Sequence, residues 1–118
     1  MATLSSHTLS SVDGTHAGGV AITVLRIDQD GTRTAILEAS TDDGGRFCET
    51  IDLGDASADS RYEMVLQTSA YFSTRGIPQS GTQIVDDIVI RFRMPDPEGR
   101  YHIPLIIGPN GYSAWWSS

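Results

Sequence analysis

Three histidines are the residues of this 118-residue chain best suited to acid–base chemistry, because the unperturbed imidazole pKa lies near neutrality. His7 and His16 come early in the chain, and His102 follows Tyr101 in a stretch that is otherwise apolar. Each also has an ordinary structural interpretation: His7 and His16 as solvated surface residues, and His102 as a hydrogen-bonded interior residue. The positions of the three histidines alone do not decide between a catalytic role and an ordinary structural one.

The charged residues exclude several other kinds of chemistry. Fifteen Asp and Glu against eight basic residues give a net charge of −7, and every basic residue is Arg. Without lysine the chain has no Schiff-base nucleophile, lysine general base or phosphate-loop lysine. The acidic balance argues against nucleic acid or an anionic membrane as partner, since both require a basic surface. The single cysteine, Cys48, excludes an intrachain disulfide and a cysteine-rich zinc site, and favours a reducing compartment.

Targeting and membrane signals are not evident in the sequence. No apolar run approaches the roughly 18 residues of a membrane span. The Ser/Thr-rich start lacks the basic and apolar segments of a secretory signal, and the final Trp-Ser-Ser is not a peroxisomal Ser-Lys-Leu address. With 39% hydrophobic and 19% charged residues, the composition is typical of a globular domain. We therefore expect one cytoplasmic domain over residues 1–118.

The elements that must position the histidines are predicted to be short strands. Twelve glycines divide the chain into stretches rich in Val, Ile, Thr, Tyr and Phe, a pattern typical of an all-β sandwich or barrel. We expect the first strand after His7, a type I′ hairpin at Asp30-Gly31, and one short helix in residues 69–76, where alternation is absent. The predicted strands are residues 19–27, 33–39, 46–53, 61–68, 87–94, 100–107 and 112–116.

Two adjacent tryptophans, Trp115 and Trp116, stand close to the carboxy terminus. Neighbouring residues on a strand face opposite sides. At least one of these large rings is therefore expected to lie against a partner or in a pocket.

Four motifs, in order along the chain, resemble those of the transthyretin-related family, and specifically its enzyme branch, the 5-hydroxyisourate hydrolases. Residues 6–9 (Ser-His-Thr-Leu) resemble that branch's Ser/Thr-His-Val-Leu, and residues 41–46 (Thr-Asp-Asp-Gly-Gly-Arg) resemble its Thr-Asn-x-Asp-Gly-Arg. Residues 68–72 (Thr-Ser-Ala-Tyr-Phe) are similar to its Thr-Gly-Ala-Tyr-Phe. Residues 101–112 resemble its Tyr-His-Val-Pro-Leu-Leu strand and the Ser-Pro-x-Gly-Tyr-Ser turn that follows. The resemblance covers essentially the whole chain.

This resemblance implies an all-β sandwich of two four-stranded sheets with one short helix. It implies a homotetramer, a dimer of dimers, with active sites in the channel between the dimers. The implied reaction opens the ring of 5-hydroxyisourate to 2-oxo-4-hydroxy-4-carboxy-5-ureidoimidazoline in urate catabolism, with no metal or other cofactor. Transthyretins proper, which carry hormones, lack the histidine pair, so its presence here favours the enzyme.

The functional residues implied by the resemblance are His7, Arg46, His102 and Ser118. Opening the ring requires a water, a base that deprotonates it and stabilisation of charge on the carbonyl oxygen. His7 and His102 would share water activation and proton relay, in an order that the sequence leaves open. Arg46 would hold the planar, anionic substrate and the developing oxyanion, a task that suits its rigid fork of donors. Substrate contacts are expected from Arg46 and from the tail residues Trp115 and Trp116.

The chain departs from the family pattern at its end. Where the family has Tyr-Arg-Gly-Ser, the sequence reads Trp-Trp-Ser-Ser, so that Trp116 replaces an arginine. In addition, Ser10 replaces an Asp, and His16 stands where a Pro is common. These departures keep two alternatives open: a diverged enzyme that acts on another heterocycle, and a non-catalytic transthyretin-like carrier.

Overall fold

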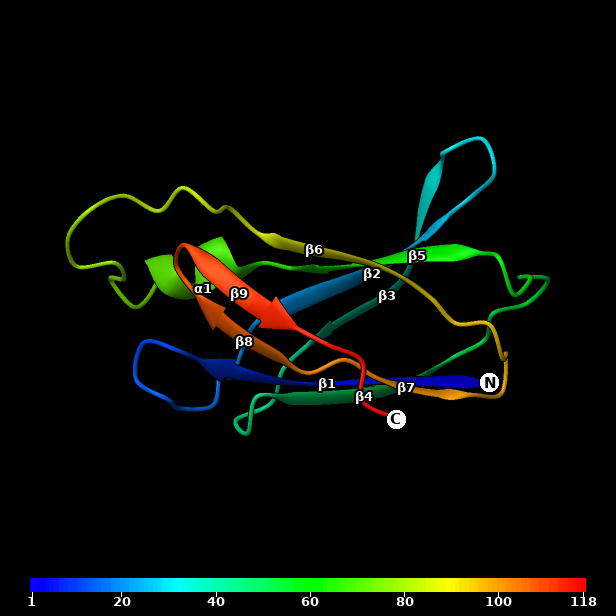
Figure 1. The fold of residues 1–118 in the computed structure, drawn as a ribbon, viewed down its shortest axis with the longest axis horizontal. Coiled ribbons are helices and arrows are strands. Elements are labelled where there is room, and N and C mark those ends of the chain that lie inside the picture. The colour runs from blue at the N-terminus through cyan, green and yellow to red at the C-terminus, as the bar shows by residue number, and fades with distance from the viewer.

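A computed structural model describes all 118 residues as two β-sheets packed face to face, with one short helix at the end of the sandwich (Figure 1). The first sheet has the order β4-β1-β8-β9, with β7 also paired to β1, and the second has the order β3-β2-β5-β6. In chain order the elements are β1 (Ala2–Ser10), β2 (Ala21–Ile27), β3 (Arg33–Ser40), β4 (Arg46–Ile51), β5 (Arg61–Leu66), α1 (Thr68–Ser73), β6 (Ile88–Arg93), β7 (Arg100–His102), β8 (Leu105–Gly108) and β9 (Gly111–Ala114).

Strands β7 and β8 form one path along β1 that is interrupted at Pro104. Both pair with β1 in parallel, where the sequence predicts a single strand over residues 100–107. Pro104 has no N–H to donate to a strand ladder. The preceding residue, Ile103, still donates its N–H to the carbonyl of Ser5 at 2.9 Å. Each sheet is therefore four strands wide, and the predicted sandwich with one short helix is confirmed.

The first strand is the element that the sequence pattern misses. The expectation that His7 precedes the first strand is wrong, because His7 lies inside β1, in the middle of the first sheet. The inward residues of β1 alternate regularly and are all buried, but Ser6, Thr8 and Ser10 are small and polar. A strand is recognised in a sequence when its inward residues are clearly more hydrophobic than its outward residues. In β1 this difference is small.

The core lies between the inward faces of the two sheets. From the second sheet, Ile22 and Val24 on β2 and Met64 on β5 are almost completely buried. They belong to the same cluster as Leu4 on β1 and Leu105 on β8. The alternation of apolar residues in the sequence correctly indicates which face of β2, β5 and β6 points inward, because these positions carry large apolar side chains.

The turn after β2 differs from the predicted type I′ hairpin. A type I′ turn needs a positive φ at both central residues, but only Gly31 has one, at +88°, and no residue other than glycine has a positive φ. Gly31 donates its N–H to the carbonyl of Asp28, and the N–H of Asp28 reaches the carbonyl of Thr32. The loop is therefore longer than two residues and closes with a left-handed glycine.

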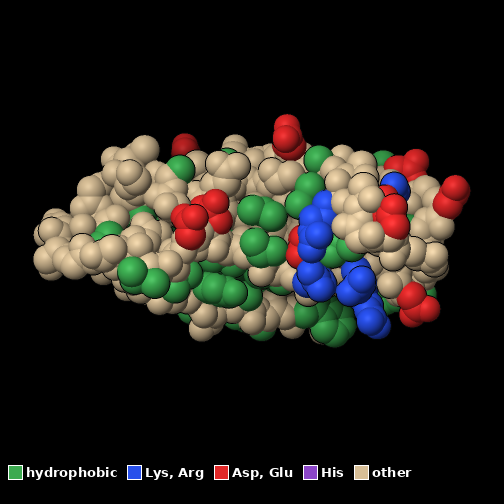
Figure 2. All heavy atoms as spheres, turned by 90° about the horizontal axis from the view of Figure 1, so that it is seen from above, with side chains coloured by type: hydrophobic (Ala, Val, Ile, Leu, Met, Phe, Trp, Pro, Cys, Tyr) green, Lys and Arg blue, Asp and Glu red, His purple; other side chains and the backbone are tan.

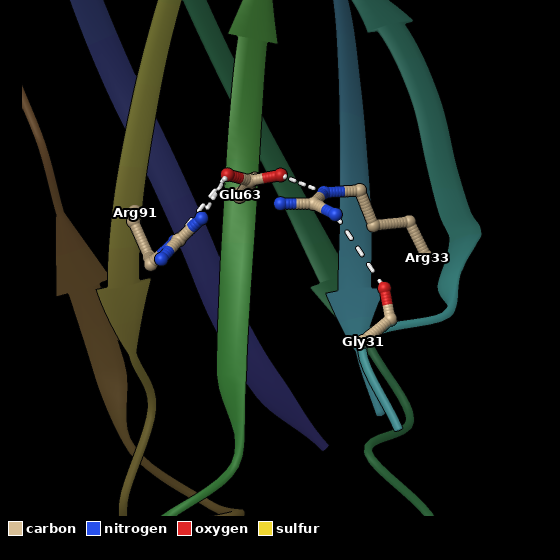
Figure 3. Close-up of polar contacts among 4 residues, drawn as sticks. All are labelled: Gly31, Arg33, Glu63 and Arg91. Carbon is tan, nitrogen blue, oxygen red and sulfur yellow. Dashed lines mark hydrogen bonds and ion pairs between the residues drawn. The ribbon is translucent and has the colours of Figure 1, made fainter. Parts of the chain in front are cut away.

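An ion triad crosses the outer face of the second sheet. Arg33 Nε lies 2.6 Å from Glu63 Oε1, and Arg91 Nη2 lies 3.1 Å from Glu63 Oε2 (Figure 3). The two guanidinium groups cover Glu63, which is only 6% exposed. The hydrogen bond from Arg33, assisted by Arg91, holds the pKa of Glu63 below its ordinary value of 4.5. Figure 2 shows basic side chains gathered at one place on this side of the molecule, and no histidine is visible there.

The single helix, α1, has six residues. No helix in the protein has the length and apolar character that a membrane crossing requires.

Candidate active site

The outer face of the first sheet brings histidines and one arginine together. On β1, Ser5 and His7 alternate with buried residues and point away from the core. The strand register places Arg46 of β4 directly opposite His7, and His102 of β7 directly opposite Ser5. Residues directly opposite each other on paired strands share a face of the sheet. His7, Arg46 and His102, which the resemblance nominates, therefore occupy one surface.

A tight turn before β4 sets the position of Arg46. Asp42 Oδ1 accepts hydrogen bonds from the N–H groups of Gly44 at 2.9 Å and Arg46 at 3.0 Å. Gly45 has a φ of +73°, and a Cβ there would collide with the carbonyl oxygen of Thr8. Glycine is therefore required at this point for β4 to approach β1 with Arg46 opposite His7.

His102 is held by Ser5, a residue that no sequence motif indicates. Ser5 Oγ lies 2.8 Å from His102 Nδ1, in a partly buried contact. No hydrogen bond within the chain engages Nε2 of His102. When Nδ1 carries the ring proton and donates it to Ser5, Nε2 keeps a lone pair that can accept a proton.

His16 is exposed, as expected, and it also belongs to this surface. His16 Nδ1 lies 3.0 Å from His7 Nε2, and the two rings stack with centroids 5.1 Å apart. The contact arises because His16 pairs with Leu9, which is two residues beyond His7 on the same strand. The only signal in the sequence was that a histidine stands where the resembled family commonly has a proline.

The surroundings of His7 favour its neutral form. Partial burial, followed by the positive charge of Arg46 and then by His16, holds the pKa of His7 below its ordinary value of 6.5. A hydrogen bond with the backbone of Gly44 opposes this shift, and His102 adds a small lowering effect. His7 is therefore an uncharged imidazole beside a permanent cation at neutral pH.

The carboxy-terminal tail runs back along β7, beside His102 (Figure 1). Ser117 donates its backbone N–H to the carbonyl of His102 at 2.9 Å, and Trp115 donates to that of Pro104 at 3.3 Å. Trp115 remains 48% exposed. Ser118 follows Ser117 directly, but no hydrogen bond joins it to the other nominated residues. The tail is thus placed at the site through its backbone, without a contact from the Ser118 hydroxyl.

Trp116 lies apart from the histidines within one chain. Its side chain lines a cavity of about 320 Å³ at the edge of the sandwich, together with Phe92, Tyr101 and Ile103. Tyr101 and Ile103 flank His102 in sequence and pack on the core side of the sheet, whereas His102 faces outward opposite Ser5. The structure therefore brings Trp116 to the opposite side of this sheet from His7 and His102.

These groups can carry out acid–base chemistry on a small ligand. An imidazole with a free Nε2, a second neutral imidazole and a guanidinium are suited to activating a water and to stabilising an oxyanion. No three His, Cys, Asp or Glu side chains are grouped as ligands of a metal ion would be.

The sequence and the fold are similar to those of known proteins. The model of the HIUase/Transthyretin family matches residues 4–116. The 5-hydroxyisourate hydrolase 2 of Rhizobium meliloti is 30% identical over 115 residues, which cover 98% of this chain and 95% of that protein. Among solved structures, Klebsiella pneumoniae 5-hydroxyisourate hydrolase superposes with a TM-score of 0.78 and 28% identity over the full length of both chains. Sea bream transthyretin in complex with thyroxine gives a TM-score of 0.77 and 29% identity, covering 98% of this chain and 96% of its own.

The family match extends over nearly the whole chain, and the superposed structures cover 98% of it or more. The chain belongs to the HIUase/transthyretin family.

Proposed function

We propose that this protein hydrolyses 5-hydroxyisourate, opening its ring to 2-oxo-4-hydroxy-4-carboxy-5-ureidoimidazoline in urate catabolism. The observation that carries the proposal is the shared surface on which His7 lies opposite Arg46, and His102 opposite its partner Ser5. Relatives such as the Rhizobium meliloti protein, named 5-hydroxyisourate hydrolase 2, support the same reaction. A carrier has no need of an oriented imidazole beside a cation.

His102 acts as the general base in this proposal. Its Nδ1 is engaged by Ser5 Oγ at 2.8 Å, which leaves Nε2 to accept a proton from water. The resulting hydroxide attacks the carbonyl carbon of a ring amide, so that a C–O bond forms and an oxyanion develops. The C–N bond then breaks, and the leaving nitrogen takes up a proton.

Arg46 and His7 complete the reaction from the neighbouring strands. Arg46 is exposed and permanently charged, and it offers paired N–H donors to the anionic ring and to the oxyanion. His7, kept neutral beside Arg46, relays a proton toward the leaving nitrogen. Ser118 and Trp115, at the end of the chain that runs past His102, would contact the substrate and close the site.

The active assembly in this proposal is a homotetramer, a dimer of dimers in the cytoplasm, with each copy of residues 1–118 serving as one domain. Two features support an assembly. All four residues of the edge strand β9 are exposed, including Tyr112, and an edge strand has unpaired backbone groups. Ile106 is also exposed, and it pairs with Leu9 on the strand that carries His7. Covering this face with a second dimer would enclose the catalytic surface in a channel.

The direct test is the loss of 5-hydroxyisourate absorbance after the compound is generated from urate by uricase. The protein is expected to accelerate this loss far above the uncatalysed rate and to yield the ring-opened product, identified by its NMR spectrum. An uncatalysed rate in the presence of a folded, assembled protein would overturn the proposed reaction.

A second candidate function is hydrolysis of a different heterocycle, and the tail is the observation that favours it. Trp116 provides an apolar ring where the resembled enzymes have a cation. The rates at which the wild type and Trp116→Arg hydrolyse 5-hydroxyisourate distinguish this candidate from the first. An inactive wild type and an active variant would favour the diverged enzyme, while a carrier would bind an aromatic ligand equally well after His7→Asn.

A further inference from the structure

The contact between His7 and His16 restricts how the two rings can be protonated. With His7 Nε2 and His16 Nδ1 only 3.0 Å apart, one nitrogen must present an N–H and the other a lone pair. A proton on both nitrogens would place two donors face to face and break the bond. The pair can therefore hold one proton beyond its neutral state, but not two, while this contact persists.

Backbone hydrogen bonds fix the position of His16. His16 pairs with Leu9 as a short extension of the sheet. On either side of it, Ser10 donates its N–H to the carbonyl of Thr15 at 2.8 Å, and Ala17 donates to that of Thr8 at 2.9 Å. Both bonds attach the loop to β1, so His16 is held beside His7 before any ligand arrives.

We propose that His16 is a positioning residue of this site, which fixes the orientation of the His7 ring and keeps that ring neutral. The contact itself is independent of the reaction, whereas its effect on turnover rests on the proposed function. No other side chain in the protein hydrogen-bonds to the His7 ring. His16 is therefore the one side chain that can choose which nitrogen of His7 carries the proton.

Charged and titratable groups reach His7 from every element packed against it. Arg46 faces it from β4, His102 from β7 and His16 from the loop after β1. All three disfavour a positive charge on His7, and only the backbone of Gly44 favours it. Removing His16 therefore eliminates one of three repulsive contributions and leaves the other two in place.

The experiment compares His16→Asn and His16→Ala with the wild type. Asn retains a short polar side chain but cannot take up a proton, and Ala removes the contact altogether. The control is Thr15→Val, which removes the 2.6 Å bond from Thr15 Oγ1 to Asp13 Oδ1 in the same loop and leaves both rings untouched. For each protein, the His7 ring is titrated by NMR without substrate, and kcat and KM for 5-hydroxyisourate are measured.

In both His16 variants, the His7 titration is expected to move to higher pH. His16→Ala should lower kcat on the order of 10-fold with little change in KM, because a misoriented catalytic group loses reactive geometry. His16→Asn should recover part of that loss, and Thr15→Val should match the wild type in both measurements.

An unchanged His7 titration in His16→Ala overturns the inference, and so does a shifted titration with unchanged kcat. If the titration shifts as expected but the wild type leaves 5-hydroxyisourate intact, the proposed substrate fails while the protonation role of His16 stands. The two failures are therefore distinguishable.

Discussion

Ser5 Oγ lies 2.8 Å from His102 Nδ1, although 97 positions separate the two residues in the chain. They meet because β7 returns parallel to β1, with His102 directly opposite Ser5. The serine is thus a fixed partner for one ring nitrogen, and it leaves the other without a hydrogen bond in the chain. For this reason the proposed reaction assigns the role of general base to His102.

Replacing Ser5 with Ala should lower kcat on the order of 10-fold, with KM nearly unchanged, because the His102 ring loses its orienting partner. Steady-state kinetics with 5-hydroxyisourate measure the effect. Thr3→Val is the matched control, since Thr3 lies on the same face of β1 two residues away. An equal fall in kcat in Ser5→Ala and Thr3→Val would show that any substitution on the outer face of β1 impairs turnover and that Ser5 has no specific role.

Replacing Arg46 with Gln should reduce kcat/KM about 100-fold, the usual scale for losing one donor to an oxyanion. The same variant should move the His7 titration to higher pH, since removal of a neighbouring positive charge makes protonation of His7 easier. Both effects are measurable on one preparation, by kinetics and by NMR. The control is Arg61→Gln on the second sheet, which should change neither kcat/KM nor the His7 titration. A comparable fall in kcat/KM in this control would show that the loss comes from the change in net charge and not from the position of Arg46.

Replacing Glu63 with Gln should lower the free energy of unfolding on the order of 1 kcal/mol at pH 7, because the ion triad with Arg33 and Arg91 is lost. The pKa of Glu63 is held below 4.5 in the folded protein. Its stabilising contribution is therefore complete above pH 4.5 and disappears as the pH falls through the folded pKa.

Urea unfolding of wild type and Glu63→Gln at pH 7 and about pH 3 checks this dependence. The difference between the two proteins should be clear at pH 7 and should narrow at the lower pH. A difference that grows on acidification contradicts the account of the triad.

Replacing Thr8 with Val should raise the free energy of unfolding by about 1 kcal/mol. Thr8 Oγ1 is buried between the sheets without a hydrogen-bond partner, and Val has nearly the same shape. Chemical denaturation measures the change, with Thr41→Val as the contrast. Thr41 Oγ1 accepts a hydrogen bond from the N–H of Val20 and donates one to the carbonyl of Ala17, so Thr41→Val should lower the free energy of unfolding. If Thr8→Val also lowered it, the Thr8 hydroxyl would have a hydrogen-bond partner after all.

The sequence predicts the fold well where side chains give strong contrast. On the first part of β2 and on β6, large apolar residues stand at every second position, and these positions form the inward faces. On β1 the buried positions include Ser6, Thr8 and Ser10. These have almost no hydrophobic signal, so the central strand of the first sheet stays hidden until its partners are known.

The site is predicted only through the resemblance, and only in part. The ordered motifs nominate His7, Arg46 and His102, and strand register brings these three to one face. Ser5 and His16 lie outside any recognisable motif, because their roles depend on contacts across strands. Such contacts follow from register, which a periodic pattern does not determine.

The sequence also does not predict that the charged side chain of Glu63 is buried. Alternation on β5 correctly predicts that Glu63 faces away from the core. It gives no indication that Arg33 and Arg91, from two other strands, would cover the carboxylate (Figure 3).

The most direct test of the proposed catalytic surface is the turnover of freshly generated 5-hydroxyisourate by His7→Asn and His102→Asn, measured beside the wild type. Each substitution removes an acid–base group and keeps a polar side chain of smaller size. The account predicts that kcat falls about 100-fold or more in each variant, while the fold and the oligomeric state are retained. Turnover close to the wild-type rate in either variant would contradict it.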